Sequence, residues 1–183
     1  MRSFLRSFDM KKMMMIFALM CAMVLSFAQN AGEKVTFTSK DLNGAEVTDS
    51  IFAKNKITMI NIWGTFCPPC IKEMPDLAEL NKANKDKGVE VVGIPIDIVD
   101  QWGNVNARTK ADGDEIIAKT GANYTHIVPT KDMMSTGILR NIQAVPATIF
   151  VDSEGKQIGK MYLGARSQKD WQKIIDSLLK KQK

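Results

Sequence analysis

Two cysteines separated by two prolines are the residues of this chain best suited to chemistry. Cys67 and Cys70 lie in the segment WGTFCPPC, which covers residues 63–70. Cysteines with this spacing can bind a metal, attach a haem, close a structural disulfide or exchange electrons with other thiols. The rest of the sequence has to decide among these four kinds of site.

Metal and haem sites would lack ligands in this chain. A structural zinc site needs four Cys or His ligands, whereas the sequence after residue 28 offers two cysteines and one histidine, His126. Attachment of haem needs a histidine directly after the second cysteine, and Ile71 is there instead. A purely structural disulfide is also disfavoured, because a loop this short gives little entropic stabilisation. We therefore predict a redox-active pair, with no metal and no cofactor.

The first 28 residues have the pattern of an export signal. An apolar run, Met13–Leu25, follows a basic segment, and Ala28 ends a small-residue cleavage pattern. The run is too short for a comfortable membrane span, which takes about 20 residues. We expect cleavage after Ala28, with retention as an uncleaved anchor as the alternative. Either outcome places the domain in the periplasm or at the extracytoplasmic face of the membrane.

The remaining segment, residues 29–183, has the size of one domain with a full core. The signal segment carries four basic residues and one acidic residue, so this domain keeps about +2 of the formal net charge of +5. Such a weak charge argues against binding to nucleic acid. We expect a monomer that acts on protein disulfide or dithiol substrates.

The cysteines follow a buried strand and begin a helix. Residues 56–63 are mostly apolar and β-branched, which predicts a buried strand, and residues 71–87 have a helical pattern. A second buried strand is expected at 89–96. Other expected strands are at 34–38, 46–50, 124–128, 147–151 and 157–163, and other expected helices are at 101–119, 132–140 and 167–180. This order predicts an α/β domain with a mixed sheet.

This position would alter the chemistry of Cys67. The free N–H groups at a helix start and the positive end of the helix dipole favour a thiolate. A free thiol has a pKa of about 8.5 and is only a few per cent ionised at pH 7. Pro68 and Pro69 fit the first helical positions, but they lack N–H groups that could approach the sulfur.

The segment WGTFCPPCIKEMPDL resembles the active site of thioredoxin-like proteins, and in particular of exported TlpA/ResA-like thiol–disulfide oxidoreductases. Four features carry the resemblance, which extends from about Lys34 to the C-terminus: the aromatic residues before the pair, the C-x-x-C itself, Pro75, and Val145-Pro146. The resemblance implies a thioredoxin-like fold, in which helices flank a central mixed sheet.

The resemblance also implies roles for individual residues. Cys67 matches the exposed nucleophile, and Cys70 matches the resolving thiol. Pro146 matches a cis-proline that faces the pair, and Val145 would offer backbone groups to an extended substrate. Trp63 would shield the thiols and border the substrate site, although it could equally be a core aromatic.

One residue departs from the thioredoxin pattern. Thioredoxins have a buried aspartate where this chain has Asn61, and an amide cannot accept a proton at physiological pH. Glu73 is the replacement candidate for acid–base catalysis, because it lies three residues after Cys70 on the same helix face. The alternative for Glu73 is a solvated carboxylate that stabilises the first turn. We expect His126 at a strand surface, without a catalytic role.

Two other functions stay open at this point. A peroxiredoxin-type peroxidase would share the fold, but it has a threonine where Gly64 stands three residues before Cys67. A non-catalytic binding module would not need both cysteines. TlpA/ResA-like relatives mostly act as reductants, often in cytochrome c maturation, and the resemblance therefore implies a membrane thiol as electron donor.

Overall fold

The computed structural model describes residues 34–135 and 137–182, and the predicted signal peptide lies outside them. The described chain contains a five-stranded mixed sheet with strand order β5-β4-β3-β6-β7 and a separate two-stranded hairpin. The strands are β1 (Thr38–Lys40), β2 (Glu46–Thr48), β3 (Ile57–Trp63), β4 (Val89–Pro95), β5 (Thr125–His126), β6 (Ala147–Asp152) and β7 (Gln157–Leu163). The helices are η1 (Asp49–Lys54), α2 (Pro68–Asn84), η2 (Lys85–Lys87), α3 (Ala107–Thr120), α4 (Lys131–Ser135) and α5 (Gln168–Lys181).

The central strand β3 places the cysteine pair. All seven residues of β3 are buried, as expected for an apolar strand that is covered on both faces. The strand pairs in parallel with β4 from Ile57 to Trp63 and antiparallel with β6 from Ile57 to Ile62. The C-x-x-C follows directly at the carboxyl end of β3, where open α/β sheets place their functional sites.

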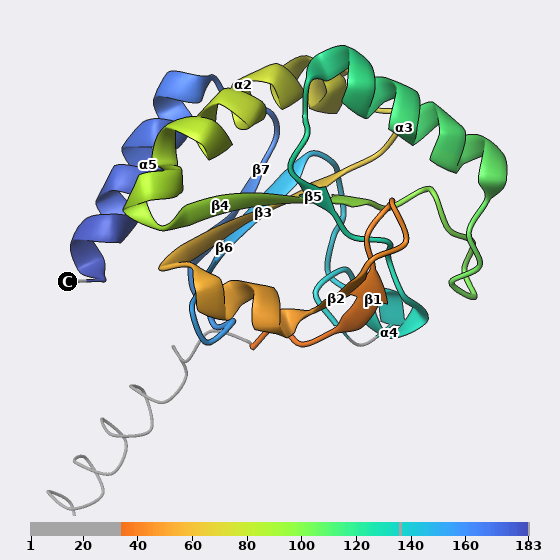
Figure 1. Ribbon diagram of the computed structural model, residues 1–183, viewed down its shortest axis with the longest axis horizontal. Coiled ribbons are helices and arrows are strands. Elements are labelled where there is room, and N and C mark those ends of the chain that lie inside the picture. Colours follow the sequence, from red (N-terminus) through yellow and green to blue (C-terminus); the bar gives the residue numbers. More distant parts are fainter. Residues whose placement is uncertain (1–33, 136, 183) are drawn as a thin grey trace, which may run out of the picture. The chain divides into compact units, whose positions relative to one another are not determined.

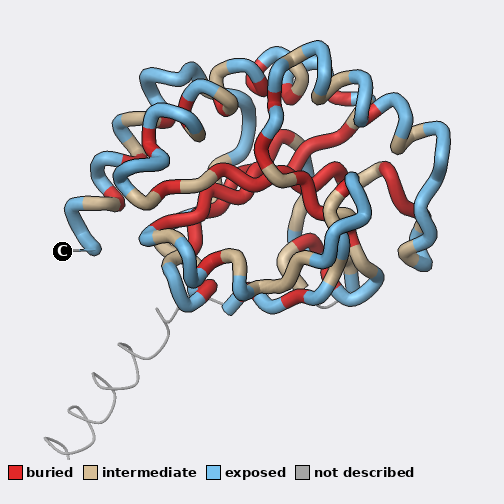
Figure 2. Tube along the Cα trace, viewed as in Figure 1, coloured by how far each residue is buried: buried red, intermediate tan, exposed pale blue. Residues whose placement is uncertain are grey.

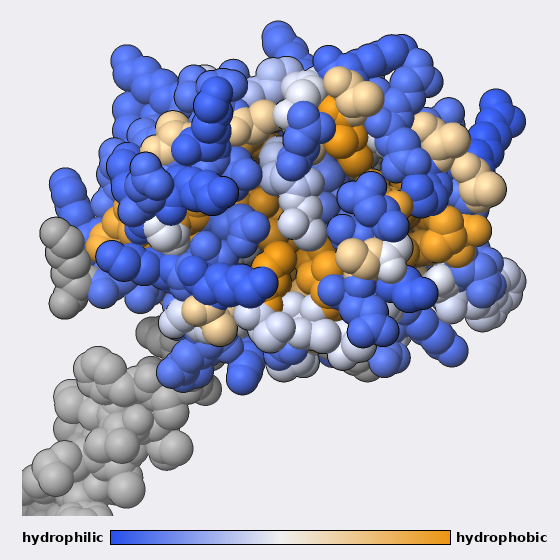
Figure 3. Space-filling view, viewed as in Figure 1, coloured by the Kyte–Doolittle hydropathy of each residue, from blue (hydrophilic) through white to orange (hydrophobic). Residues whose placement is uncertain are grey.

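Different elements cover the two faces of the sheet. Helices α2, α3 and α5 lie on one face, while η1, the β1–β2 hairpin and α4 lie on the other (Figure 1). The core on the α2 face contains both cysteines, and the core on the opposite face is aliphatic apart from two phenylalanines. Burial is concentrated along the sheet and on the inner sides of the helices (Figure 2). The face seen in Figure 3 is mainly hydrophilic, with apolar side chains showing in the hollows.

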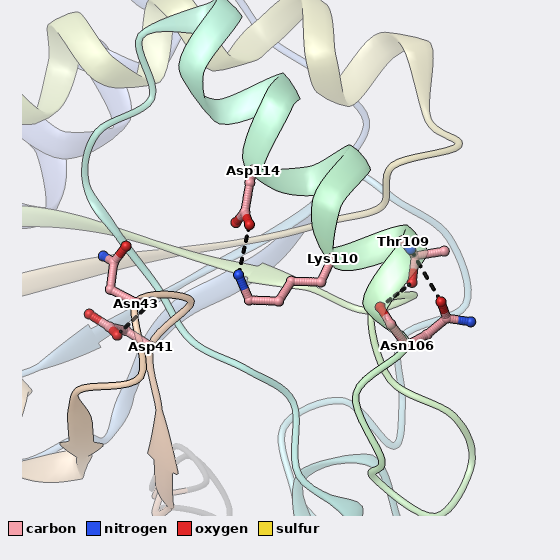
Figure 4. Close-up of polar contacts among 6 residues, drawn as sticks. All are labelled: Asp41, Asn43, Asn106, Thr109, Lys110 and Asp114. Carbon is pink, nitrogen blue, oxygen red and sulfur yellow. Dashed lines mark hydrogen bonds and ion pairs between the residues drawn. The ribbon is translucent and has the colours of Figure 1, made fainter.

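Side-chain caps fix the turn before α3. Asn106 accepts the backbone N–H groups of Arg108 and Thr109, and Lys110 forms an ion pair with Asp114 one turn later (Figure 4). A helix was expected within residues 101–119, at least from Asp114 on, and α3 begins at Ala107. The preceding residues instead form a turn in which the Asp100 carboxylate accepts backbone N–H groups, and such a turn competes with helix formation.

Most other sequence predictions are confirmed with shifted ends. The strand expected at 34–38 is wrong over most of its length, because Lys34 forms only an isolated bridge and β1 covers Thr38–Lys40. The strand expected at 46–50 stops at Thr48, because this residue caps η1 by accepting the Ser50 N–H. The helix expected at 132–140 ends at Ser135. The α/β architecture, the β6–β7 hairpin and the closing helix are confirmed. Within the described parts of the chain, no helix is long and apolar enough to span a membrane.

Candidate active site

The cysteine pair is oxidised and caps helix α2. Cys67 and Cys70 form a disulfide, with their Cα atoms 5.3 Å apart. Cys67 is the N-cap of α2, and its sulfur accepts the backbone N–H of Cys70 at 3.3 Å. Pro68 and Pro69 occupy the first two helical positions, as predicted. The Cys67 sulfur therefore lies at the positive end of the helix, where a thiolate would be stabilised after reduction.

Cys67 is less accessible than the resemblance implies. Its exposed fraction is 4%, against 1% for Cys70, so the expectation of an exposed nucleophile is wrong for this oxidised state. Its sulfur is bonded to Cys70, and both cysteines belong to the core of the α2 face. The neighbouring Phe66 is 65% exposed, and it is the prominent apolar side chain beside the pair.

Trp63 is fully buried under the site and is held by a histidine. The Trp63 indole Nε1 donates to His126 Nδ1 at 3.3 Å, and His126 Nε2 donates to the carbonyl of Ala122 at 2.9 Å. These two bonds assign the neutral tautomer with its proton on Nε2. Contact of the Trp63 side chain with substrate stays a prediction, which its burial does not favour.

The prediction that His126 lies at a strand surface is wrong. The side chain is 4% exposed and stacks on Tyr124 with ring centroids 4.6 Å apart. Its ring occupies the space over Gly93, where a Cβ atom would come within 2.2 Å of Nδ1. Burial lowers the pKa of His126 to about 4, with smaller opposing effects from the Ala122 carbonyl and the Asp114 charge. His126 is therefore neutral at physiological pH.

An aspartate after strand β4 anchors the loop before the cysteines. The backbone N–H of Thr65 donates to Asp97 Oδ1 at 3.0 Å, and the Thr65 hydroxyl donates to Oδ2. Sequence reasoning did not single out Asp97. Its place directly after a buried parallel strand was the available signal, because the carboxyl ends of such strands meet at one edge of the sheet.

The proline predicted to face the pair is in the cis conformation. The Val145–Pro146 peptide bond is cis, Pro146 is buried, and Val145 is half-buried against the core that contains the cysteines. Strand β6 begins one residue later and pairs Ala147 with Ile62. Pro146 therefore stands beside Trp63 at the end of the strand that leads into the C-x-x-C. Its role and that of Val145 in substrate binding stay predictions.

Glu73 is buried rather than solvated, so the alternative of a surface carboxylate is wrong. Its exposed fraction is 3%, and Oε1 accepts the backbone N–H of Arg166 at 2.7 Å and the indole N–H of Trp171 at 2.6 Å. Oε2 is buried and has no hydrogen-bond partner among the described residues. Burial raises the pKa of Glu73, whereas the two N–H donors, the Arg166 charge and the Asn61 amide partly lower it.

Asn61 occupies a buried position on the same face of the sheet. It is 1% exposed, and its Nδ2 donates to the hydroxyl of Thr148 at 3.2 Å. The Asn61 amide cannot accept a proton at physiological pH. Glu73 is the buried carboxylate on this face and can do so. No cluster of three or more His, Cys, Asp or Glu side chains in the described residues is arranged to hold a metal ion.

Comparison with known proteins shows which family this chain resembles. A family model described as Redoxin matches residues 30–179. Thiol-disulfide oxidoreductase ResA of Bacillus cereus (strain ZK / E33L) is 30% identical over 132 residues, which cover 70% of this chain and 67% of that protein. Thiol-disulfide oxidoreductase ResA of Geobacillus kaustophilus is 24% identical over 142 residues, which cover 78% of this chain and 74% of that protein.

Solved structures agree on the fold. A thiol:disulfide interchange protein of the thioredoxin family from Chlorobium tepidum TLS superposes with a TM-score of 0.66 at 22% identity, covering 82% of this chain and 97% of that one. A secreted disulfide oxidoreductase of Mycobacterium tuberculosis gives 0.60 at 21% identity, covering 77% and 95%. These likenesses establish a thioredoxin-like α/β fold with a mixed central sheet flanked by helices, as the sequence predicted.

Proposed function

Because the chain belongs to the Redoxin family and is a thiol–disulfide oxidoreductase with a Cys67–Cys70 pair, we propose that it reduces disulfides in protein substrates outside the cytosol. Cys67 is the nucleophile, Cys70 is the resolving thiol, and Glu73 exchanges the proton of Cys70. The observation that carries the assignment of Cys67 is its place as N-cap of α2, with its sulfur accepting the Cys70 N–H.

The first step forms a mixed disulfide. In the reduced protein the Cys67 thiolate attacks one sulfur of the substrate disulfide, and a new S–S bond forms between them. The substrate S–S bond breaks, and its other sulfur leaves as a thiolate that takes a proton from solvent. The helix N-terminus supports this step because it favours the thiolate of Cys67 over the thiol.

The second step releases the product and closes the pair. The Cys70 thiol gives its proton to Glu73, and the resulting thiolate attacks the Cys67 sulfur. The Cys67–Cys70 bond forms, and the second substrate sulfur leaves with the electron pair and is protonated in turn. In total two electrons and two protons pass to the substrate. A carboxyl group whose pKa is raised by burial is suited to this exchange near neutral pH.

Substrate would bind where the chain is exposed around the pair. Val145 precedes the cis-proline and can offer backbone groups to an extended segment, while the exposed ring of Phe66 lies next to Cys67. A protein that donates electrons would return the pair to the dithiol. The resemblance to TlpA/ResA-like proteins favours a membrane thiol for this purpose.

Export is part of the proposal. Residues 1–28 would direct the chain out of the cytosol, and residues 29–183 would act there as a monomeric domain, released or anchored. The solved relative from Mycobacterium tuberculosis is described as secreted, which supports this location.

Substitution of each cysteine tests the function. We expect Cys67→Ala to abolish reduction of insulin disulfides, and Cys70→Ala to form mixed disulfides with substrate that it cannot release. The trapped species would be seen as an adduct on a non-reducing gel that dithiothreitol removes. If Cys67→Ala kept its turnover, the assignment of Cys67 as nucleophile would be wrong.

A further inference from the structure

The two oxygens of the Glu73 carboxylate have different surroundings. Oε1 accepts two short hydrogen bonds, from the backbone N–H of Arg166 at 2.7 Å and from the indole of Trp171 at 2.6 Å. Oε2 is also buried and has no hydrogen-bond partner among the described residues, although the Asn61 amide also acts on this carboxylate and lowers its pKa. A buried polar atom without a partner is rare in folded proteins and calls for an explanation.

The donors on Oε1 decide where a proton can bind. Each carboxylate oxygen has two lone pairs, and both donors that reach Oε1 are N–H groups that cannot accept a proton from it. Protonation of Oε1 would place an O–H among these donors, whereas protonation of Oε2 leaves both hydrogen bonds intact. We propose that Trp171 is a positioning residue that, together with the Arg166 backbone, occupies Oε1 and leaves Oε2 as the atom that takes and returns the proton. This inference rests on the proposed acid–base role of Glu73.

The beginning of α5 is built to deliver these donors. Arg166 and Ser167 precede the helix, Ser167 caps it, and Trp171 is the first of its buried residues. A second bond ties the same end to α2, because the backbone N–H of Gln168 donates to Asp76 at 2.9 Å. The positive end of the α5 dipole thus faces Glu73, and its N–H donors favour the ionised form of that carboxylate.

The Trp171 ring is itself held in place. It is fully buried and lies edge-on to Phe150 and Tyr162, with centroid separations of 6.1 and 5.7 Å. The Arg166 guanidinium lies over the Trp171 ring, 5.0 Å from its centroid. A rigid ring with a single N–H gives a fixed donor direction, which is the property that a positioning group needs.

Replacement of Trp171 by Phe tests the inference, since it removes the N–H and keeps an aromatic ring. The oxidised protein is used, because its cysteines do not titrate, and the Glu73 carboxyl is followed by ¹³C NMR against pH. Its signal is identified by its loss in Glu73→Gln. A hydrogen bond to a charged group favours the ionised form, so we expect the apparent pKa of Glu73 to rise by about one unit in Trp171→Phe. An unchanged pKa would overturn the proposal.

A matched control separates the N–H from packing. Phe150→Leu disturbs the ring against which Trp171 packs but no hydrogen bond of Glu73, and it should leave the pKa of Glu73 within a few tenths of a unit. If Phe150→Leu shifted the pKa as much as Trp171→Phe, the effect would be one of packing, and the positioning role would be wrong.

Two further readouts keep the test decisive. In the wild-type protein the indole N–H signal of Trp171 should shift with pH with the same apparent pKa as the Glu73 carboxyl. This readout does not depend on whether Trp171→Phe folds. An indole signal that does not change with this titration would contradict the proposal. If Glu73→Gln resolved mixed disulfides at the wild-type rate, the acid–base part of the proposed function would fail, whereas the pKa shift in Trp171→Phe would still support the positioning contact.

Discussion

Glu73 and His126 are both buried on the α2 face of the sheet, but their hydrogen bonds differ. Both ring nitrogens of His126 have partners, one in Trp63 and one in the Ala122 carbonyl. Glu73 has two donors on Oε1 and none among the described residues on Oε2. The fully paired ring of His126 has a structural role, whereas the proton exchange proposed for Glu73 uses an oxygen that is buried without a hydrogen-bond partner among the described residues. Burial alone does not separate the two.

The two groups should also affect stability in opposite directions. His126 has a folded pKa lowered from 6.5 to about 4, so the unfolded chain binds more protons between these values, and stability falls as pH drops through that window. Glu73 has a raised folded pKa, so the folded chain binds more protons above 4.5, and stability falls as pH rises toward the folded pKa.

The largest effect that tests this contrast is expected for Glu73→Gln. Loss of the proton acceptor should slow resolution of the mixed disulfide by about 100-fold, the usual scale of general acid–base catalysis. Removal of a negative charge near the thiols should at the same time lower the apparent cysteine pKa. Single-turnover disulfide exchange and thiolate absorbance, followed across pH, measure both effects. Overlaying curves for the variant and the wild type would make Glu73 a structural residue only.

A smaller effect, on stability rather than rate, is expected for His126→Gln. The wild-type protein should lose on the order of 3 kcal/mol of unfolding free energy between pH 7 and 4 through this histidine, at 1.36 kcal/mol per pKa unit. The variant cannot titrate and should lack that part of the pH dependence. Urea denaturation at several pH values measures it. Resolution rates within a few-fold of wild type would sharpen the contrast, and a 100-fold loss would break it.

The smallest effect is expected for Asp114, the charged residue that influences the pKa of His126. Asp114 on α3 pairs with Lys110 at 2.7 Å (Figure 4) and slightly raises the pKa of His126. Asp114→Asn should cost about 0.3–0.5 kcal/mol, as for other exposed pairs one turn apart, and should move the pKa of His126 slightly further down. Urea denaturation in low and high salt is the measurement. A loss that persists in high salt would not come from the ion pair.

The sequence was informative where local pattern decides the structure. Apolar β-branched runs located β3 and β4, and the helix after Cys67 followed from the prolines and the pattern around Leu77 and Leu80. The cis bond before Pro146 was predictable only through the family resemblance.

What the sequence could not supply are contacts made across the fold. The donors to Glu73 lie 93 and 98 residues further along the chain, and neither spacing nor periodicity connects them. The burial of His126 depends on Gly93 in the neighbouring strand, which leaves room for the ring. The burial of Cys67, at 4% exposed, was likewise not predicted from the sequence.

The hydrogen bonds between the start of α5 and the carboxylates of α2 form late in synthesis of the chain. Trp171 is translated 98 residues after Glu73. The cysteines therefore leave the ribosome long before helix α5, whose Trp171 donates to Glu73. After residue 28 they are the only two cysteines of the chain, so an early disulfide has a single intramolecular pairing. The hydrogen bonds to Glu73 Oε1 can form only when the C-terminal helix α5 packs against α2. A chain that ended at Gly164 would carry the cysteine pair and Glu73 but would lack both groups that donate to Glu73 Oε1.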